Sequence, residues 1–166
     1  MSRIVLLAFC ATVVPLLAQA PKVPKERHFS SIQEVLHLVP VDLPRNDPRA
    51  NKLLREAVNK WIAFSMPVGR FERYNGIEHQ LRARSSNHET MDWRLGKLRL
   101  DLSACILPES EVAADVKTVG KMLVVIGQIT DVKLLDNGTR LWLEIKYCHA
   151  GFEAQRILAR TKIAPR

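Results

Sequence analysis

Two segments in the N-terminal part of the chain carry apolar residues at helical spacing. The first follows a Ser N-cap and ends before Pro40, with apolar positions at Ile32, Val35, Leu36 and Val39. The second begins at Asp47, a residue type that caps helices, and Pro48 favours its first helical position. Its apolar stripe consists of Leu53, Leu54, Ala57, Val58 and Trp61. The pattern therefore predicts a short first helix and a longer second helix that reaches Trp61.

Beyond Trp61 the period changes from 3.6 to 2, which predicts a mainly β region. The dipeptide Asn75-Gly76 is typical of a type I′ turn between two strands. A two-residue loop there sets Arg73 opposite Glu78 and Glu72 opposite His79. We interpret these as cross-strand charge pairs.

A polar loop over residues 85–92 precedes a third strand, in which apolar residues alternate with polar ones from residue 97 to residue 106. Gly96 marks a break in the apolar alternation, so we expect a bulge there. Residues 108–121 carry Val112, Val116 and Val119 near one face and end at Gly120-Lys121. This pattern predicts a short helix or a helical loop.

The last two strands flank Asn137-Gly138-Thr139, which satisfies the glycosylation sequon and also suits a tight hairpin turn. With Asn137 and Gly138 as the loop residues, largely apolar pairs fall together on one face. These pairs are Leu134–Leu141, Val132–Leu143, Thr130–Ile145 and Gln128–Tyr147. On the other face Lys133 pairs with Trp142, a cation–π combination. The turn therefore explains the motif better than glycosylation does.

The order of elements is three strands, a short helix and two strands, which is the chain order of the five-stranded OB barrel. A meander-type sandwich and a half-barrel are the alternatives. Glu111 to Ala150 resembles a family of exported bacterial OB domains known as tRNA anticodon-binding-like. The resemblance rests on Gly120-Lys121, the alternating strand from Val125 to Ile129 and the final Cys148, and covers roughly the last third of the mature chain. It implies a binding fold and no catalytic residues.

Residues 1–20 have the form of a signal peptide: an early Arg3, an apolar run of about 14 residues and the small-x-small pattern Ala18-Gln19-Ala20. We expect an exported protein, periplasmic or extracellular, with cleavage after Ala18 or Ala20 and no membrane span. The expected organisation is a signal peptide over 1–20, a basic leader with a short helix over 21–46, and an OB-like barrel domain with an N-terminal helix over 47–166. The leader before residue 30 is expected to be extended or flexible.

Cleavage takes away one Arg and no acid, so the net charge of +8 becomes +7 in the mature chain. Such an excess of positive charge favours acidic partners, and it also simply aids solubility. Cleavage also removes Cys10 and leaves Cys105 and Cys148. In OB order the third and fifth strands run parallel side by side and carry these two cysteines near their ends. We therefore predict a disulfide, with two reduced thiols as the alternative.

Catalytic and metal-binding signatures are missing from the sequence. The five histidines are His28, His37, His79, His88 and His149. Their spacing does not suit a metal site, and neither His-x-x-x-His nor Cys-x-x-Cys occurs in the sequence. Ser85, Ser86, His88 and Asp92 are neighbours in a polar loop, which does not make a triad. We therefore predict no catalytic residues, no metal and no cofactor.

The basic residues of the second and third strands form the candidate binding site, because OB barrels bind ligands on this face. The predicted anionic-ligand face comprises Arg82, Arg84, Trp93, Arg94, Lys97 and Arg99. The favoured function is a non-enzymatic module that binds nucleic acid, a glycan or an acidic protein. The alternative is an envelope structural or protein-interaction module without a small ligand, and a hydrolase is the third candidate. The sequence does not specify the ligand, the partner or the oligomeric state.

Overall fold

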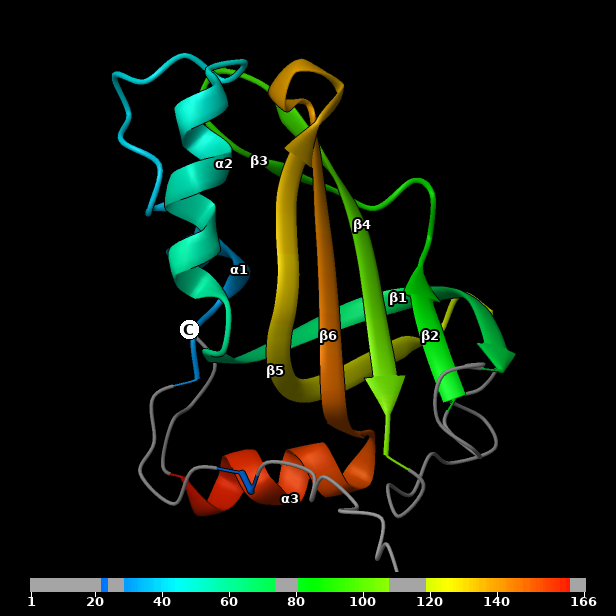
Figure 1. The fold of residues 1–166 in the computed structure, drawn as a ribbon. Helices are drawn as coiled ribbons and strands as arrows, with labels where there is room; N and C mark the ends of the chain where they lie inside the picture. Colours follow the sequence, from blue (N-terminus) through cyan, green and yellow to red (C-terminus); the bar gives the residue numbers. More distant parts are fainter. Residues whose placement is uncertain (1–21, 24–28, 74–80, 108–118, 162–166) are drawn as a thin grey trace, which may run out of the picture.

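Six strands form one sheet that closes on itself. The computed structural model describes residues 22–23, 29–73, 81–107 and 119–161. The strands are β1 (Trp61–Arg73), β2 (Leu81–Ser85), β3 (Thr90–Asp92), β4 (Lys97–Ile106), β5 (Met122–Leu135) and β6 (Arg140–Ala150). Their order is β2-β1-β5-β6-β4-β3, and a further pairing of β2 with β4 closes a five-stranded barrel of β1, β2, β4, β6 and β5 (Figure 1). The short β3 is added on the edge of β4.

The pairing of β4 with β6 is parallel and runs from Arg99 opposite Arg140 to Ile106 opposite Cys148. The predictions of a mainly β fold, a five-stranded OB-like barrel and a parallel pairing between its third and fifth strands are therefore confirmed. The helix expected between the third and fourth strands falls largely on residues 108–118, which lie outside the described residues. The segment 1–20 lies outside them as well.

Alternation along the strands builds the core inside the barrel. In β4 the residues of one parity, from Leu98 to Ile106, are all buried, whereas Lys97 and Arg99 are exposed. Gly127 of β5 also lies on the inward side, because a Cβ there would come 2.5 Å from Ile145 Cγ2 and 2.6 Å from Cys148 Sγ. Only glycine fits such a close approach between neighbouring strands.

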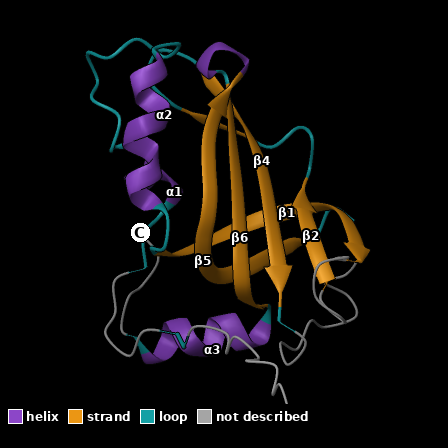
Figure 2. Ribbon diagram, viewed as in Figure 1, coloured by secondary structure: helices purple, strands orange, loops and turns teal. Residues whose placement is uncertain are grey.

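Helix α1 (Ile32–Leu36) and helix α2 (Pro48–Leu54) form where the caps predict. Ser31 and Glu34 make a capping box at α1, and Asp47 accepts a hydrogen bond from the backbone N–H of Arg49 at α2. Helix α2 stands beside β5 (Figures 1 and 2). The extension of the second helix to Trp61 is wrong. The α-helix ends at Leu54, the 3-10 turn η1 (Arg55–Ala57) follows, and Trp61 begins β1.

A second, smaller core lies on the outer side of β1 and β5. Phe29, Trp61, Ile126 and Ala154 are buried there, and helix α3 (Phe152–Arg160) covers them. Helix α3 was not expected from the sequence, and Phe29 was expected to lie in the leader. Ser30 next to it makes a parallel bridge with Ile62, so this end of the leader is built into the fold. The tertiary contact of Trp61 with α3 overrides its helical spacing.

The turn between β5 and β6 confirms the interpretation of Asn137-Gly138. Thr139 N–H donates to Asp136 C=O at 3.2 Å, and both Asn137 (φ 53°) and Gly138 (φ 79°) have the positive φ of a type I′ turn. A Cβ on Gly138 would also lie 2.3 Å from the carbonyl oxygen of Arg45, so the turn packs tightly on the N-terminal region. The contact of Lys133 with the Trp142 ring is confirmed at 5.1 Å.

The strand pairing beyond this turn follows the prediction for only part of its length. The pairs Leu134–Leu141 and Val132–Leu143 are confirmed, but Ile145 lies opposite Ile129 and Gln128 lies opposite Lys146. The pairs predicted for Thr130 and for Tyr147 are therefore wrong. The register shift between Ile129 and Asp131 accounts for the difference, and a second shift follows between Ile126 and Gln128.

The first hairpin and the polar loop also depart from the prediction. Arg73 pairs with Leu81 and Glu72 with Arg82, so the predicted pairing of Arg73 with Glu78 and Glu72 with His79 is wrong. Residues 74–80, which include the Asn75-Gly76 turn, lie outside the described residues. Within the predicted 85–92 loop, residues 90–92 form β3, and the Trp93 N–H donates to the Gly96 C=O at 3.0 Å in a tight β3–β4 turn.

Cys105 and Cys148 are buried and are not joined to each other, so the predicted disulfide is not present in the structure. Cys148 belongs to the main core, whereas Cys105 lies on the outward parity of β4 beside Arg82. Tyr147 has a positive φ of 55°, and this bulge turns Cys148 inward, against the simple alternation of β6. The two side chains therefore leave their strands toward opposite sides of the sheet.

Candidate functional site

The six predicted site residues fall into three groups with different surroundings. Arg82 and Arg84 lie side by side on the outward face of β2. Trp93 and Arg94 lie in the turn that follows β3, and Lys97 and Arg99 lie at the start of β4. The structure therefore does not gather all six residues on a single face.

Three arginines converge on the carboxylate of Glu72 on the outward face of the barrel. Arg84 Nε donates to Glu72 Oε1 at 2.7 Å, Arg70 Nε lies 3.8 Å from Oε2, and Arg82 Nη1 lies 4.0 Å from Oε1. Arg82 Nη2 also contacts Glu144 Oε1 of β6 at 3.3 Å. The register explains the cluster, because Glu72 pairs with Arg82 and Arg70 with Arg84 across β1 and β2.

Further residues of this face were not predicted as site residues. Ser103 of β4 lies between Arg84 and Glu144 in the strand pairing, is 2% exposed, and its hydroxyl has no hydrogen-bond partner in the described part of the chain. Lys146 of β6 lies close enough to influence the neighbouring Cys105 thiol. We call Arg70, Arg82, Arg84, Lys146, Glu72, Glu144 and Ser103 the arginine face. Alternation along β1, β4 and β6 carried the signal for the added residues, but only the pairing of distant strands brought them to the same face as Arg82 and Arg84.

The electrostatics of the arginine face follow from its composition. Its four cationic side chains surround two carboxylates. The hydrogen bond from Arg84 lowers the pKa of Glu72, and the charges of the three arginines act in the same direction. Burial raises the pKa of the Cys105 thiol despite its hydrogen bond with Arg82, so this cysteine stays protonated at neutral pH.

Trp93 and Arg94 are engaged within the fold. Trp93 is buried, and the guanidinium carbons of Arg94 and Arg45 lie 4.4 Å and 5.2 Å from its ring centroid. Arg94 also donates through its two terminal nitrogens to the carbonyls of Val39, Pro40 and Leu43. Arg45 Nη2 donates to the Arg94 C=O at 2.9 Å. We call this set the arginine clamp, because it ties the turn after β3 to the N-terminal loop.

Lys97 and Arg99 are each paired with a carboxylate. Lys97 Nζ lies 2.8 Å from Asp92 Oδ1, and Arg99 Nη2 lies 3.2 Å from Asp136 Oδ2. Arg140 joins this network through Asp136 at 2.8 Å and Asp101 at 3.4 Å. Cations and carboxylates are therefore balanced at this end of the barrel, unlike on the arginine face.

The described residues include neither a metal-binding cluster nor a helix that could span a membrane. No group of three or more His, Cys, Asp or Glu side chains among them could hold a metal ion. None of the helices in the described ranges is long and apolar enough to cross a bilayer.

Comparison with known proteins leaves the chain without a family assignment. The sequence matches no family model and no curated protein sequence. Among solved structures the fold is similar to part of a crystal structure described as an aspartyl-tRNA synthetase from Leishmania major Friedlin, with a TM-score of 0.35 and 14% identity. The match covers 82% of this chain and 24% of that one, so the chain spans about a quarter of that protein.

Proposed function

We propose that the protein is an exported, non-enzymatic binding module that holds an anionic polymer on its arginine face. The observation that carries the proposal is the convergence of Arg70, Arg82 and Arg84 on one carboxylate, with bond lengths and separations from 2.7 to 4.0 Å. An arginine presents a planar fork of donors that matches phosphate, sulfate and carboxylate groups. In this arrangement Glu72 occupies the position that an acidic group of a ligand would share.

The geometry of the face suits a ligand with repeated negative charges. The side chain of Arg70 is 65% exposed and that of Arg84 is 26% exposed, so both guanidinium groups can contact an arriving anion. Before the anion arrives, Glu72 holds Arg84 on this face. Trp142 is half-buried two residues from Glu144 on the same parity of β6, and Lys133 Nζ lies over its ring at 5.1 Å, which adds a cation near this face.

The expected export of the chain supports an anionic glycan as the first ligand to test. The signal-like segment 1–20 carries this expectation, and the net charge of +7 expected after its cleavage agrees with an acidic ligand. Nucleic acid and acidic protein present the same charge in other forms. The test therefore compares heparin, single-stranded DNA and polyglutamate on the same protein.

The decisive experiment measures the affinity for these three polymers at several salt concentrations. The double variant R70E/R84E reverses two charges on the arginine face, and K97E/R99E makes the same change on the balanced end as a matched control. We expect R70E/R84E to weaken binding by about 100-fold at low salt and K97E/R99E by less than about fivefold. Equal loss in both variants would show that binding follows net charge alone. Absence of binding to all three polymers at about 50 mM salt would refute the proposal.

A further inference from the structure

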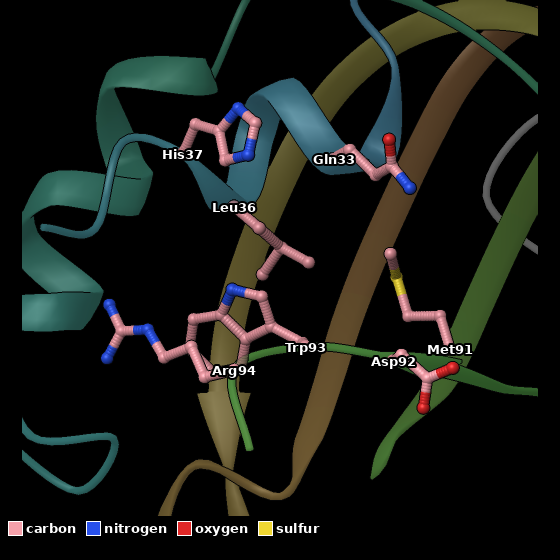
Figure 3. Close-up of a pocket in the computed structure, with 7 residues that line it drawn as sticks. All are labelled: Gln33, Leu36, His37, Met91, Asp92, Trp93 and Arg94. Carbon is pink, nitrogen blue, oxygen red and sulfur yellow. The ribbon is translucent and has the colours of Figure 1, made fainter. Parts of the chain in front are cut away.

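A cavity of about 280 Å³ lies between α1 and the end of β3 (Figure 3). Leu36, Met91 and Trp93 make its apolar part, and Figure 3 shows the Leu36 side chain directly beside the Trp93 ring. The polar lining residues are Gln33, His37, Asp92 and Arg94. The cavity shares no residue with the arginine face, so its role is a separate question.

The cavity is small for a ligand site and is large enough to admit one large apolar side chain. Sites for drug-sized molecules usually have volumes of roughly 300–1,000 Å³, and this cavity lies below that range. Interfaces between proteins often depend on a single apolar anchor that fills a pocket with a polar rim. Leu95, which follows Arg94 in the β3–β4 turn, is fully exposed and adds apolar surface to this region of the chain. These properties favour a protein segment over a small molecule.

The strand β3 offers an open edge beside the cavity. β3 is the last strand in the order of the sheet and pairs only with β4 among the described strands. Leu100 N–H donates to Glu89 C=O at 2.9 Å and Trp93 N–H donates to Gly96 C=O at 3.0 Å. Because bonding alternates along an antiparallel pair, Thr90 and Asp92 direct their N–H and C=O groups away from β4. These groups are available to another strand.

The partly buried carboxylate of Glu89 indicates that a segment bound at this edge would carry a positive charge. Glu89 has the same parity as Met91 and Trp93, and therefore projects from the same side of the β3 segment about 7 Å before Met91. Burial raises its pKa, and no cation of the described residues offsets this effect. A Lys or Arg side chain placed there would stabilise the ionised carboxylate.

We propose that the β3 edge binds an extended segment of a partner protein by strand addition. The backbone of that segment pairs with Thr90 and Asp92, and one large apolar side chain enters the cavity over Leu36, Met91 and Trp93. A Lys or Arg two positions away along the segment contacts Glu89, because side chains of the same face recur every second residue in a strand. Main-chain bonds supply affinity, and the cavity with Glu89 supplies specificity.

The test uses the full chain and a phage-displayed library of random seven-residue peptides. We expect enrichment of peptides that carry Leu, Met or Phe two positions from Lys or Arg. The most enriched peptide is then synthesised, labelled and titrated by fluorescence polarisation. Failure to enrich any sequence of this pattern would overturn the proposal.

Variants of exposed residues separate the parts of the mechanism. Gln33→Trp fills the cavity, and Thr90→Pro removes an N–H that points away from β4, so we expect each to weaken peptide binding at least about tenfold. Thr90→Ala keeps the N–H and is the matched control, with unchanged affinity expected. Glu89→Gln should weaken binding about threefold, and only for peptides with the basic residue. R70E/R84E should leave peptide affinity unchanged, which separates this site from the arginine face.

Each variant is compared with the wild type by circular dichroism and urea unfolding, so that a loss of binding is assigned only to a folded protein. Peptide binding that persists in folded Gln33→Trp and Thr90→Pro would overturn the proposed site. A concentration-dependent dimer in sedimentation that Thr90→Pro abolishes would also overturn it, because a second copy of this chain would then occupy the β3 edge.

Discussion

The arginine face and the arginine clamp contain the same kind of residue and use it in different ways. In the clamp, Arg94 donates to three backbone carbonyls and lies over the Trp93 ring, so its donors are used within the fold. On the arginine face, Arg70 and Arg84 share one carboxylate and stay partly exposed. The partner of an arginine, and not its charge, therefore determines whether it stabilises the fold or is available to a ligand.

The largest expected effect is the loss of the clamp in Arg94→Ala. The change leaves the carbonyls of Val39, Pro40 and Leu43 without their charged donor, and we expect the free energy of unfolding to fall by about 3 kcal/mol. Urea unfolding measures this change in the free energy of unfolding. Arg94→Lys keeps the charge but not the planar fork, and should recover less than about half of the loss. A change below about 0.5 kcal/mol in Arg94→Ala would show that the clamp does not stabilise the fold.

Arg45→Ala should have a smaller effect on the same clamp. Arg45 supplies one hydrogen bond, at 2.9 Å to the Arg94 C=O, and the weaker of the two ring contacts, at 5.2 Å. We expect a loss of about 1 kcal/mol in urea unfolding, with heparin affinity unchanged within about twofold. A large fall in heparin affinity of the folded variant would contradict the separation of clamp and face.

Glu72→Gln tests the arginine face by removing a negative charge instead of positive charges. The substitution removes the carboxylate that competes with a ligand for Arg70, Arg82 and Arg84, so we expect heparin affinity to rise about threefold. Asp136→Asn makes the same change in the balanced network around Arg99 and should alter the affinity by less than about 1.5-fold. The measurement is a heparin titration at fixed salt, and an equal rise in both variants would contradict a local effect.

The smallest effect concerns the pH dependence of stability. The pKa of Glu72 is lowered from its ordinary value of 4.5, mainly by the hydrogen bond from Arg84. The folded state therefore binds a proton at Glu72 less readily than the unfolded state does. The contribution of the ionised Glu72 to the free energy of unfolding is thus present above pH 4.5 and is lost as the pH falls through the lowered pKa. We expect Glu72→Gln to reduce the fall in melting temperature between pH 5 and pH 3 by about 2 °C. An unchanged or steeper fall would show that the pair does not contribute to acid stability.

Local patterns in the sequence predicted much of the fold, because caps, turns and alternation act over a few residues. Ser31 and Asp47 cap their helices, Asn137-Gly138 forms the turn, and the alternation of residues 97–106 buries the expected face. The parallel pairing of the third and fifth strands also followed from the order of elements alone. For the site, the sequence predicted Arg82 and Arg84 as candidate ligand-binding residues of the second strand, and the structure places both on its outward face.

Only the tertiary structure decided which side chains meet. Trp61 continues a helical stripe in the sequence, yet it begins a strand because its ring is buried with Phe29 and Ala154. A bulge at Tyr147 turns Cys148 into the core, and no local pattern marks that bulge. Glu72 and Arg94 acquire their roles from residues of other strands and loops. Their partners depend on how distant segments pack, which is the information that a one-dimensional pattern lacks.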